Sequence, residues 1–499
     1  DADMNIQLIT QDYASVAADW LIVGVPEADA LPETVAALND ALGGSFTRLR
    51  KGKDLSGKNA ETVALLDTAN IAAKRVLLLG LGKSEALSQG SLRKAVTTAA
   101  RQLSSKETST IALALPHLAR DGFSQADQLE TAVAALCVGC VGQGIYQREP
   151  KRFAFDEVKV VIAPADDEGV LQGAINRGEI IGDAINLTRD LVNRPAQDIN
   201  PSSFAAVAEG LAKQDGLECA IFDEDRLRQE KMEALLAVAR GSDQPPRMVI
   251  LKHNGGGANA PTLYLCGKGV TFDSGGLSLK PNDSMLDMKM DMAGAATVLG
   301  SMIAIARLKL PVNVVGLMGL VENMVSGKSY KLGDVLTARN GVTIEVHNTD
   351  AEGRLVLSDV LSYAVDQKAD CIVDLATLTG ACMVALGNDV VGAFSNDQSW
   401  CDTVVSAARD RGELVWQMPM YELYDELLKS DVADIKNVGG RWGGAITAAK
   451  FLEHFVGDTK WVHLDIAGPA FSDKNQPHQE GGVTWVMVRT LVEVAGRVS

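Results

Sequence analysis

The sequence lacks most of the features that mark secreted, membrane-spanning and nucleic-acid-binding proteins. Its 499 residues include 7 cysteines, an odd number scattered along the chain, which argues against a disulfide framework and fits a reducing compartment. No uninterrupted apolar run is long enough to cross a bilayer. Positive charge is scarce: the chain has 47 Lys and Arg against 64 Asp and Glu, and its net charge is -17. This balance disfavours nonspecific binding to nucleic acid or to an anionic membrane.

Three short features that would suggest other functions have simpler interpretations. Cys137 and Cys140 lie in an apolar stretch that we expect to be a packed helix, and no second cysteine pair is present nearby to complete a zinc site. The basic stretch 48–53 is expected to be a solvated loop. Residues 1–3 have neither the basic region nor the apolar core of a signal peptide, so we interpret them as an artificial extension and expect a cytoplasmic protein.

The length of the chain predicts two α/β domains, because one hydrophobic core rarely organises 499 residues. In the first part, strand-like runs at 75–79 and 158–162 alternate with helical stretches, and we assign residues 1–168 to a smaller N-terminal α/β domain. A helix at about 170–192 is expected within a linker of residues 169–195.

Residues 196–499 predict a larger C-terminal α/β/α domain. Apolar strand-like runs alternate with helical patterns along this part, which is typical of a central sheet covered by helices on both faces. We expect that sheet to be mixed. The expected strands lie near residues 248, 263, 312, 342, 371 and 461, and the expected helices include 292–308 and 444–455.

The most informative segment is the octapeptide at 348–355. Asp350, Glu352 and Arg354 follow one another at two-residue spacing, and in an extended chain that spacing places all three side chains on one side. A strand-like alternation at 342–346 precedes the segment and a helical pattern follows it. We therefore expect the two carboxylates and the guanidinium to lie where a strand ends, a common place for a site in an α/β protein.

A second stretch supplies further charged side chains. A buried strand is expected at 263–266, and a glycine-rich segment with Lys268 and Asp273 follows it, then Lys280 and Asp291. Because glycines flank the polar groups, we expect these side chains to be delivered from a loop. Together with the octapeptide, the candidate metal-binding set is Lys268, Asp273, Asp291, Asp350 and Glu352.

The charges of this set predict two divalent metal ions. The four carboxylates would repel one another and raise their own pKa values, whereas two dications would balance them. Oxygen ligands suit manganese or magnesium as well as zinc. Lys268 can bind metal only after losing its proton, which costs roughly 4 to 5 kcal/mol at pH 7, and metal binding can supply that free energy. Asp287 is expected to be a solvated surface residue and is not counted as a ligand.

These segments resemble the signature segments of the leucyl aminopeptidases, a two-metal family that includes bacterial aminopeptidase A. The likeness covers most of residues 190–499, whereas about the first 165 residues match loosely, as expected for a family whose N-terminal domain varies. The matching segments are 348–355, 267–276, 288–296, 374–381, 443–449 and 463–468.

The resemblance implies the ligands of each metal. A tightly held ion would be bound by Lys268, Asp273, Asp291 and Glu352, and an exchangeable ion by Asp273, Asp350 and Glu352. Asp273 and Glu352 would bridge the two ions, and the backbone carbonyl of Asp350 would be a further ligand. Manganese or zinc is expected, and magnesium and cobalt are possible substitutes.

The resemblance also implies the catalytic groups and the substrate. Lys280 would stabilise the oxyanion, and Arg354, which cannot itself act as a base, would hold a bicarbonate ion that transfers the proton of the nucleophilic water. Substrates would be peptides with a free N-terminus, preferably beginning with leucine or another large apolar residue. The subsite for that first side chain would include Met288, Thr377, Ala467 and Ala470.

The family forms homohexamers built from two trimers, so we expect the same assembly. Some bacterial relatives also bind DNA, and the charge balance does not favour this second activity here. Two further hypotheses compete with an aminopeptidase: a two-metal phosphatase, whose carboxylates would bind metals that grip a phosphate, and a regulatory protein with a vestigial site.

Overall fold

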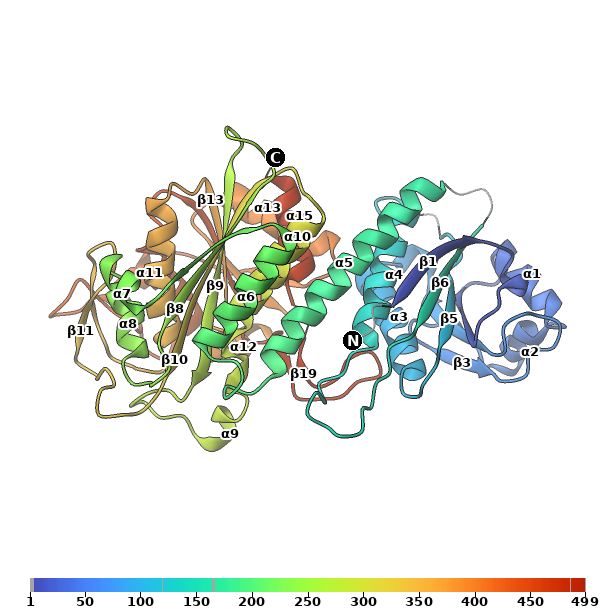
Figure 1. Ribbon diagram of the computed structural model, residues 1–499, viewed down its shortest axis with the longest axis horizontal. Coiled ribbons are helices and arrows are strands. Elements are labelled where there is room, and N and C mark those ends of the chain that lie inside the picture. Colours follow the sequence, from blue (N-terminus) through green and yellow to red (C-terminus); the bar gives the residue numbers. More distant parts are fainter. Residues whose placement is uncertain (1–3, 119, 164–166, 485, 499) are drawn as a thin grey trace. The chain divides into compact units, whose positions relative to one another are not determined.

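The computed structural model describes residues 4–118, 120–163, 167–484 and 486–498, so residues 1–3, interpreted above as an artificial extension, lie outside the described residues. Two compact units are present: Asp1–Asn186 with Lys474–Gly481, and Leu187–Asp473 with Gly482–Ser499. Both units are α/β, so the predicted fold class is confirmed (Figure 1). The predicted helix near 170–192 is confirmed as α5 (Glu168–Asn193), which begins in the first unit and ends in the second.

The first unit contains a six-stranded sheet in the order β1-β6-β5-β2-β4-β3. All neighbouring strands are parallel except β3, which pairs antiparallel with β4. Alternation along β2 separates two cores: Trp20 and Ile22 pack in one, and Leu21 and Val23 pack in the other. The strands are β1 (Asn5–Thr10), β2 (Trp20–Pro26), β3 (Thr62–Leu65), β4 (Val76–Gly82), β5 (Thr110–Ala114) and β6 (Glu157–Ile162).

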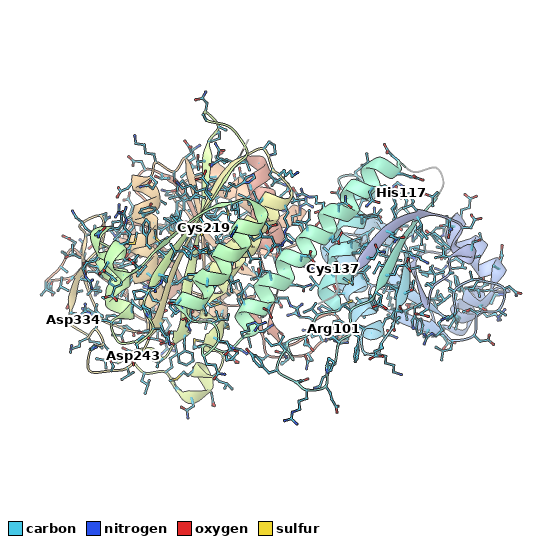
Figure 2. All side chains as sticks on the ribbon, viewed as in Figure 1. Arg101, His117, Cys137, Cys219, Asp243 and Asp334 are labelled. Carbon is cyan, nitrogen blue, oxygen red and sulfur yellow. The ribbon has the colours of Figure 1, made fainter. Side chains whose placement is uncertain are left out.

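Helices α3 and α4 supply residues to the core of Trp20, and α1 and α2 to the core of Leu21. The expected solvated loop at 48–53 is wrong, because most of these residues form the end of α2. The predicted packed helix is confirmed as α4, which carries Cys137 (Figure 2). Cys137 and Cys140, the residue that follows the helix, are both buried. The helices are η1 (Tyr13–Ser15), α1 (Glu33–Ala41), α2 (Ser45–Gly52), η2 (Ser84–Ala86), α3 (Gln89–Leu103) and α4 (Gln125–Gly139).

The second unit is built on an eight-stranded sheet in the order β15-β14-β17-β13-β9-β10-β8-β7. The four central strands β17, β13, β9 and β10 are parallel, whereas β14, β8 and β7 pair antiparallel with a neighbour, so the predicted mixed sheet is confirmed. The strands are β7 (Glu218–Phe222), β8 (Arg247–Asn254), β9 (Thr262–Asp273), β10 (Asn313–Asn323), β13 (Cys371–Ala376), β14 (Val391–Ser395), β15 (Val415–Gln417) and β17 (Lys460–Asp465).

Two glycines of β10 show that helices cover both faces of this sheet. A Cβ atom added at Gly316 would lie 2.8 Å from Met302 of α10, and one added at Gly319 would lie 2.8 Å from Val360 of α11. Residues three apart in a strand point to opposite faces, so α10 and α11 lie on opposite sides of β10. The predicted helices at 292–308 and 444–455 are confirmed as α10 (Ala293–Arg307) and α14 (Gly444–Glu453).

The strand expected near 342 is present as β12 (Thr343–Glu345), but its expected place in the central sheet is wrong. It lies in a separate three-stranded sheet between β11 (Val335–Thr337) and β16 (Ile435–Lys436). A two-stranded sheet, β18 (Phe471–Ser472) and β19 (Gly482–Val483), completes the strands. The remaining helices are α6 (Pro201–Asp215), α7 (Glu224–Gln229), α8 (Glu233–Ala239), α9 (Asn282–Met285), η3 (Met288–Met292), α11 (Glu352–Asp366), α12 (Gly380–Leu386), α13 (Gln398–Asp410), η4 (Glu422–Leu428) and α15 (Val488–Arg497).

One helical stretch of the described residues, Asn282–Arg307, is long and apolar enough to cross a membrane by length and composition alone, with a mean hydropathy of 1.2. It comprises α9, η3 and α10, and 83% of its most apolar window is buried inside the protein. The glycine contacts above place α10 against the central sheet, so its apolar character is explained by its position in the core.

Candidate metal centre

Lys268 is a strand residue rather than a loop residue. Strand β9 continues to Asp273, so the expected loop after residue 266 is wrong, and Lys268 is only 3% exposed. The neighbouring strand β13 ends at Ala376, and Leu375 pairs with Gly267, so the side chain of Lys268 lies where its neighbour has just ended. This is the carboxyl edge of parallel strands, where sites of α/β proteins commonly lie.

Gly353 allows Lys268 to take this position. A Cβ atom at Gly353 would lie 2.5 Å from Cε and 2.7 Å from Nζ of Lys268, closer than real atoms approach. Gly353 lies in the first turn of α11. The lysine stem therefore passes directly over the start of this helix, and a larger residue at position 353 would require the lysine to move.

The octapeptide does not form the extended segment that we expected. Helix α11 begins at Glu352, so Glu352 and Arg354 are helical, and only Asp350 precedes the helix. Successive positions two apart on a helix point roughly 200° apart, so the three side chains do not share one face. The pattern predicted which residues surround the site but not the backbone conformation that brings them there.

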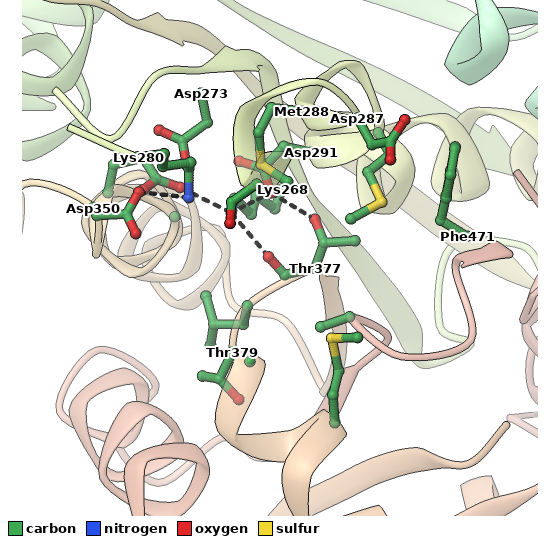
Figure 3. Close-up of a pocket in the computed structure, with 18 of the residues that line it drawn as sticks. Lys268, Asp273, Lys280, Asp287, Met288, Asp291, Asp350, Thr377, Thr379 and Phe471 are labelled. Carbon is green, nitrogen blue, oxygen red and sulfur yellow. Dashed lines mark hydrogen bonds and ion pairs between the residues drawn. The ribbon is translucent and has the colours of Figure 1, made fainter. Parts of the chain in front are cut away.

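The structure nevertheless brings the predicted ligands together. One carboxylate oxygen from each of Asp273, Asp350 and Glu352 lies within 4.8 Å of the other two, a spacing that suits a metal site. Lys268 Nζ lies 2.7 Å from Asp291 Oδ1 (Figure 3) and 2.8 Å from Glu352 Oε1, so Lys268 and Asp291, the remaining two predicted ligands, adjoin this cluster.

The donor set also passes a test of fit for metal ions. Asp291 and Glu352 are nearly fully buried, and Oδ2 of Asp291 and Oε2 of Glu352 have no hydrogen-bond partner among the described residues. Buried carboxylate oxygens without partners are costly and rare in a folded protein. A divalent cation bound by these oxygens would remove that cost.

Burial and mutual repulsion raise the pKa values of three carboxyl groups in the cluster. Burial is the largest cause for Asp273, Asp291 and Asp350, and it raises the pKa of Asp273 to about 7. Burial would also raise the pKa of Glu352, but the charge and hydrogen bond of Lys268 and the charge of Lys280 together outweigh it and lower that pKa. For Lys268 itself, burial lowers the pKa, and the charges of Asp291 and Glu352 more than reverse this effect. The lysine is therefore held protonated by the same carboxylates that would share a metal with it.

Lys280 forms ion pairs with the two carboxylates of the cluster that Lys268 does not contact in an ion pair. Its Nζ lies 2.9 Å from Asp273 Oδ2 and 2.5 Å from Asp350 Oδ1 (Figure 3). The two lysines thus approach the carboxylate cluster from different sides, with Lys268 buried and Lys280 15% exposed. An ammonium group at the margin of the cluster is placed to meet a negative charge that develops on a substrate.

Arg354 contacts the loop before α14 rather than a carboxylate. Its Nη1 donates a 2.7 Å hydrogen bond to the backbone carbonyl of Asn437, whereas its Nε has no hydrogen-bond partner among the described residues. Burial lowers the pKa of Arg354 to about 10, so the group remains charged at neutral pH. One edge of the guanidinium is thus left for an anion.

Three residues that the sequence pattern did not single out hold the two signature segments together. Asn323, at the end of β10, donates from Nδ2 to Asp273 Oδ1 and to the carbonyl of Thr349, at 2.8 and 3.0 Å. The hydroxyl of Tyr330 donates to the same carbonyl at 2.6 Å. Thr349 in turn donates from Oγ1 to the carbonyl of Gly275 at 2.7 Å. The sequence offers one signal for Asn323: it is a polar residue at the end of the apolar strand β10, where side chains of a site are commonly found.

The predicted metal ligands, together with Lys280 and Arg354, line a cavity of about 460 Å³. Of the residues predicted for the first side-chain subsite, Met288, Thr377 and Ala467 line it, whereas Ala470 is fully buried and is not among the lining residues of the described chain. Additional apolar and polar lining comes from Met290, Leu378, Thr379, Gly380, Met383, Asn388 and Phe471, and acidic side chains at Asp283, Asp287 and Asp473 also line the cavity.

Both units of the chain have relatives among known proteins. Residues 186–492 match the catalytic domain of the cytosol aminopeptidase family, and residues 22–147 match its N-terminal domain. A probable cytosol aminopeptidase of Rhodopirellula baltica is 52% identical over 92% of this chain and 88% of its own length. One of Solibacter usitatus is 43% identical over 99% of each chain.

Solved structures give the same result. A mutant of tomato leucine aminopeptidase matches with a TM-score of 0.89 and 35% identity over 99% of this chain and 96% of its own. The bottromycin maturation enzyme BotP in complex with Mn matches with a TM-score of 0.83 and 34% identity over 96% of this chain and 99% of its own.

Proposed function

The chain belongs to the cytosol aminopeptidase family and is therefore a metal-dependent aminopeptidase, and from this premise we propose that it releases leucine and other large apolar residues from the N-termini of peptides. The observation that carries the proposal is the cavity in which Met288, Met290 and Met383 adjoin the carboxylate cluster. Methionine side chains are apolar and adaptable, so they suit large apolar side chains of varied shape.

We propose that two divalent ions are held by the residues expected from the sequence: Lys268, Asp273, Asp291, Asp350 and Glu352. The 4.8 Å carboxylate cluster and the two buried oxygens without partners support this assignment. Bound metals would lower the pKa of a water molecule and polarise the scissile carbonyl. Manganese is favoured because a similar structure is in complex with Mn, and oxygen ligands would also accept zinc, magnesium or cobalt.

In this mechanism Lys280 stabilises the oxyanion of the attacked carbonyl. Its ammonium group lies at the margin of the cluster, where its charge meets the charge that develops as the carbonyl becomes tetrahedral. Burial lowers the pKa of Lys280, but the charge of Asp273 and a hydrogen bond to Asp350 outweigh it and raise the pKa above its ordinary value, so the group stays cationic.

Arg354 would hold a small planar anion such as bicarbonate, which would supply the acceptor for the proton of the nucleophilic water, since the arginine cannot accept it. Its fixed position against Asn437 and its unpartnered Nε support this role. A planar guanidinium edge binds a planar oxyanion through two parallel hydrogen bonds.

The first test is hydrolysis of a leucine anilide after chelation and after addition of manganese, zinc or magnesium. Restored activity that is absent from Asp350→Ala supports the proposal and ranks the metals. Faster cleavage of a glutamate or lysine anilide than of the leucine compound would contradict the proposed preference. The rival phosphatase interpretation is set aside because both domain matches and the relatives are aminopeptidases.

We further propose assembly into a homohexamer in the cytoplasm. The second unit exposes many large apolar side chains, as expected for surfaces buried between copies. The seven cysteines are free, which suits a reducing compartment, and relatives are named cytosol aminopeptidases. The net charge of -17 gives no support to DNA binding, which a gel shift at physiological salt would test. Exposed apolar residues of the second unit include Trp416, Tyr421, Leu423, Val432 and Trp442.

A further inference from the structure

Two loops of the cavity leave the central sheet side by side. Strands β13 and β17 are parallel, Ala376 pairs with Asp465, and the backbone N–H of Ile466 donates to the carbonyl of Ala376 at 2.9 Å. The chain beyond β13 carries Thr377, and the chain beyond β17 carries Ala467. Both of these residues line the cavity, so two parts of its wall begin at neighbouring positions of the sheet.

The carboxylate of Asp465 connects these two loops. Asp465 is fully buried, and its Oδ1 accepts hydrogen bonds from the backbone N–H of Leu378 at 3.3 Å and of Ala467 at 3.1 Å. Its Oδ2 accepts a 2.6 Å hydrogen bond from the hydroxyl of Thr379. Both oxygens act only as acceptors, and the donors come from both loops. Asp465 itself is not among the lining residues of the cavity.

Thr379 links Asp465 to helix α12 through two hydrogen bonds. While its hydroxyl donates to Asp465, its Oγ1 accepts a 3.0 Å hydrogen bond from the backbone N–H of Cys382 and so caps the helix. Figure 3 shows Thr379 where the chain enters this helix. Met383 of α12 lines the cavity, so the direction of the hydroxyl at Thr379 affects an apolar wall of the subsite.

Thr377 connects the same loop to the metal centre. Its hydroxyl donates to Asp291 Oδ1 at 2.8 Å, and its carbonyl accepts from Lys268 Nζ at 2.9 Å. The segment from Thr377 to Thr379 is thus fixed at one end to two predicted metal ligands and at the other end to Asp465. The position of the subsite relative to the metal centre depends on both ends.

We propose that Asp465 is a positioning residue that sets the width of the first side-chain subsite and thereby the preference for large over small first residues. This inference deepens the proposed function and depends on it. Asparagine at position 465 would present an NH2 group either to a backbone N–H or to the Thr379 hydroxyl, whose oxygen already accepts from Cys382. With the NH2 group toward the backbone, the N–H groups of Leu378 and Ala467 would lose their acceptor, and with it toward Thr379 the hydroxyl would lose its own. Either loss would free the loops, and with them α12, to move apart.

The test compares leucine and alanine anilides with the manganese-loaded, full-length protein. For Asp465→Asn we expect kcat/KM on leucine to fall roughly tenfold, because a large apolar side chain loses wall contacts that alanine never makes. On alanine the change should stay within about threefold, and manganese content should stay unchanged.

Thr379→Val should shift the leucine-to-alanine ratio in the same direction as Asp465→Asn. Thr379→Ser, which keeps the hydroxyl, should leave the ratio close to that of the unaltered protein. In the double variant Asp465→Asn with Thr379→Val, kcat/KM on leucine should fall by less than the product of the two single falls. Both substitutions act on the same hydrogen bond, between Thr379 and Asp465.

Asp374→Asn is the matched control. Asp374 is as fully buried as Asp465 and lies on the adjacent strand, but it accepts from Trp461 Nε1 at 2.5 Å and contacts His463 Nδ1 at 2.6 Å, and both partners belong to β17 rather than to the two loops. Its variant should lower Tm without changing the leucine-to-alanine ratio.

The inference is overturned by an unchanged ratio in folded Asp465→Asn, or by an equal shift in Asp374→Asn. If Asp465→Asn does not fold, an unchanged ratio in Thr379→Val overturns it. Absence of leucine release by the unaltered protein with every metal is a different result: it removes the proposed substrate class, and this inference with it.

Discussion

Single residues decide how the carboxylate cluster is built and what it can do. Asp273, Asp291, Asp350 and Glu352 converge from three separate segments, and two lysines approach them from different sides. The residue types were evident from the sequence, because acid groups at these spacings suit few roles other than metal binding. Their partners were not, since Asn323 and Tyr330 act through contacts between segments distant in sequence.

Lys280→Ala tests the proposed oxyanion role. We expect kcat to fall by about 10² to 10³, as is typical when one donor to a developing oxyanion is removed. Manganese content, measured by elemental analysis, should be unchanged, because Lys280 is not among the proposed ligands. Full activity would remove Lys280 from the mechanism.

Gly353→Ala tests the close approach of α11 to Lys268. The added Cβ would lie 2.5 Å from Lys268 Cε, so the lysine must move and manganese affinity should fall roughly 10- to 100-fold. Titration with manganese, followed by activity and by calorimetry, measures the change. Gly210→Ala is the control, because Gly210 is also helical and a Cβ there meets nothing within 4 Å. That control should bind manganese normally and gain about 0.4 to 1 kcal/mol of stability.

At the scale of elements, the alternation of apolar residues predicted most strands and helices, whereas the lengths of elements at the site were mispredicted. Glycines at 267 and 269 suggested that the strand ends at residue 266, yet they allow α10 to approach, since a Cβ at Gly267 would lie 2.6 Å from Ala295. Strand β9 can therefore continue to Asp273. Likewise, α11 begins at Glu352 rather than near residue 355, because the polar residues of its first turn face the cluster instead of solvent. In both places tertiary contacts, which a periodic pattern does not contain, determine where the element begins or ends.

Helix α11 also contains a buried carboxyl group that predicts a pH dependence of stability. Asp359 accepts hydrogen bonds from the backbone N–H groups of Leu235 and Arg339 at 2.9 and 2.8 Å. Burial outweighs these bonds and raises the pKa of Asp359 to about 7 from 3.8. Between these pH values the folded state binds more protons at this group than the unfolded state does, so its contribution to stability falls as pH rises from about 4 to 7.

Asp359→Asn should remove this contribution. We expect the free energy of unfolding of the unaltered protein, relative to that of the variant, to be smaller at pH 7 than at pH 5. Denaturant unfolding of both proteins at the two pH values measures it. A relative stability that rises with pH would show that the hydrogen bonds, rather than burial, dominate the pKa of this group.

At the scale of the whole molecule, the exposed apolar residues are concentrated in the second unit. Trp416, Tyr421 and Trp442 are 66%, 64% and 78% exposed. Where such side chains form one large patch, the patch marks an interaction surface. The sequence indicated assembly only through the family resemblance, because an apolar residue at a subunit contact is indistinguishable in a periodic pattern from one in a core.

We expect light scattering to give about six times the mass of one chain, since burial of apolar surface drives association. Trp442→Asp combined with Trp416→Asp should shift the population to smaller species. Leu66→Asp is the control, because Leu66 is 70% exposed in the first unit, outside the apolar set proposed for assembly. An unaltered chain that remains monomeric at micromolar concentration would contradict the proposed assembly.

The hydrogen bonds of Asp465 also limit how the cavity can be redesigned. The loops after β13 and β17 share one buried acceptor, so neither can change length or sequence near Leu378 or Ala467 without disturbing the other. A loop grafted from a relative to alter selectivity would have to be transplanted together with its partner loop and with Thr379. The two loops, 86 residues apart in sequence at Thr379 and Asp465, are in this respect a single module for protein engineering.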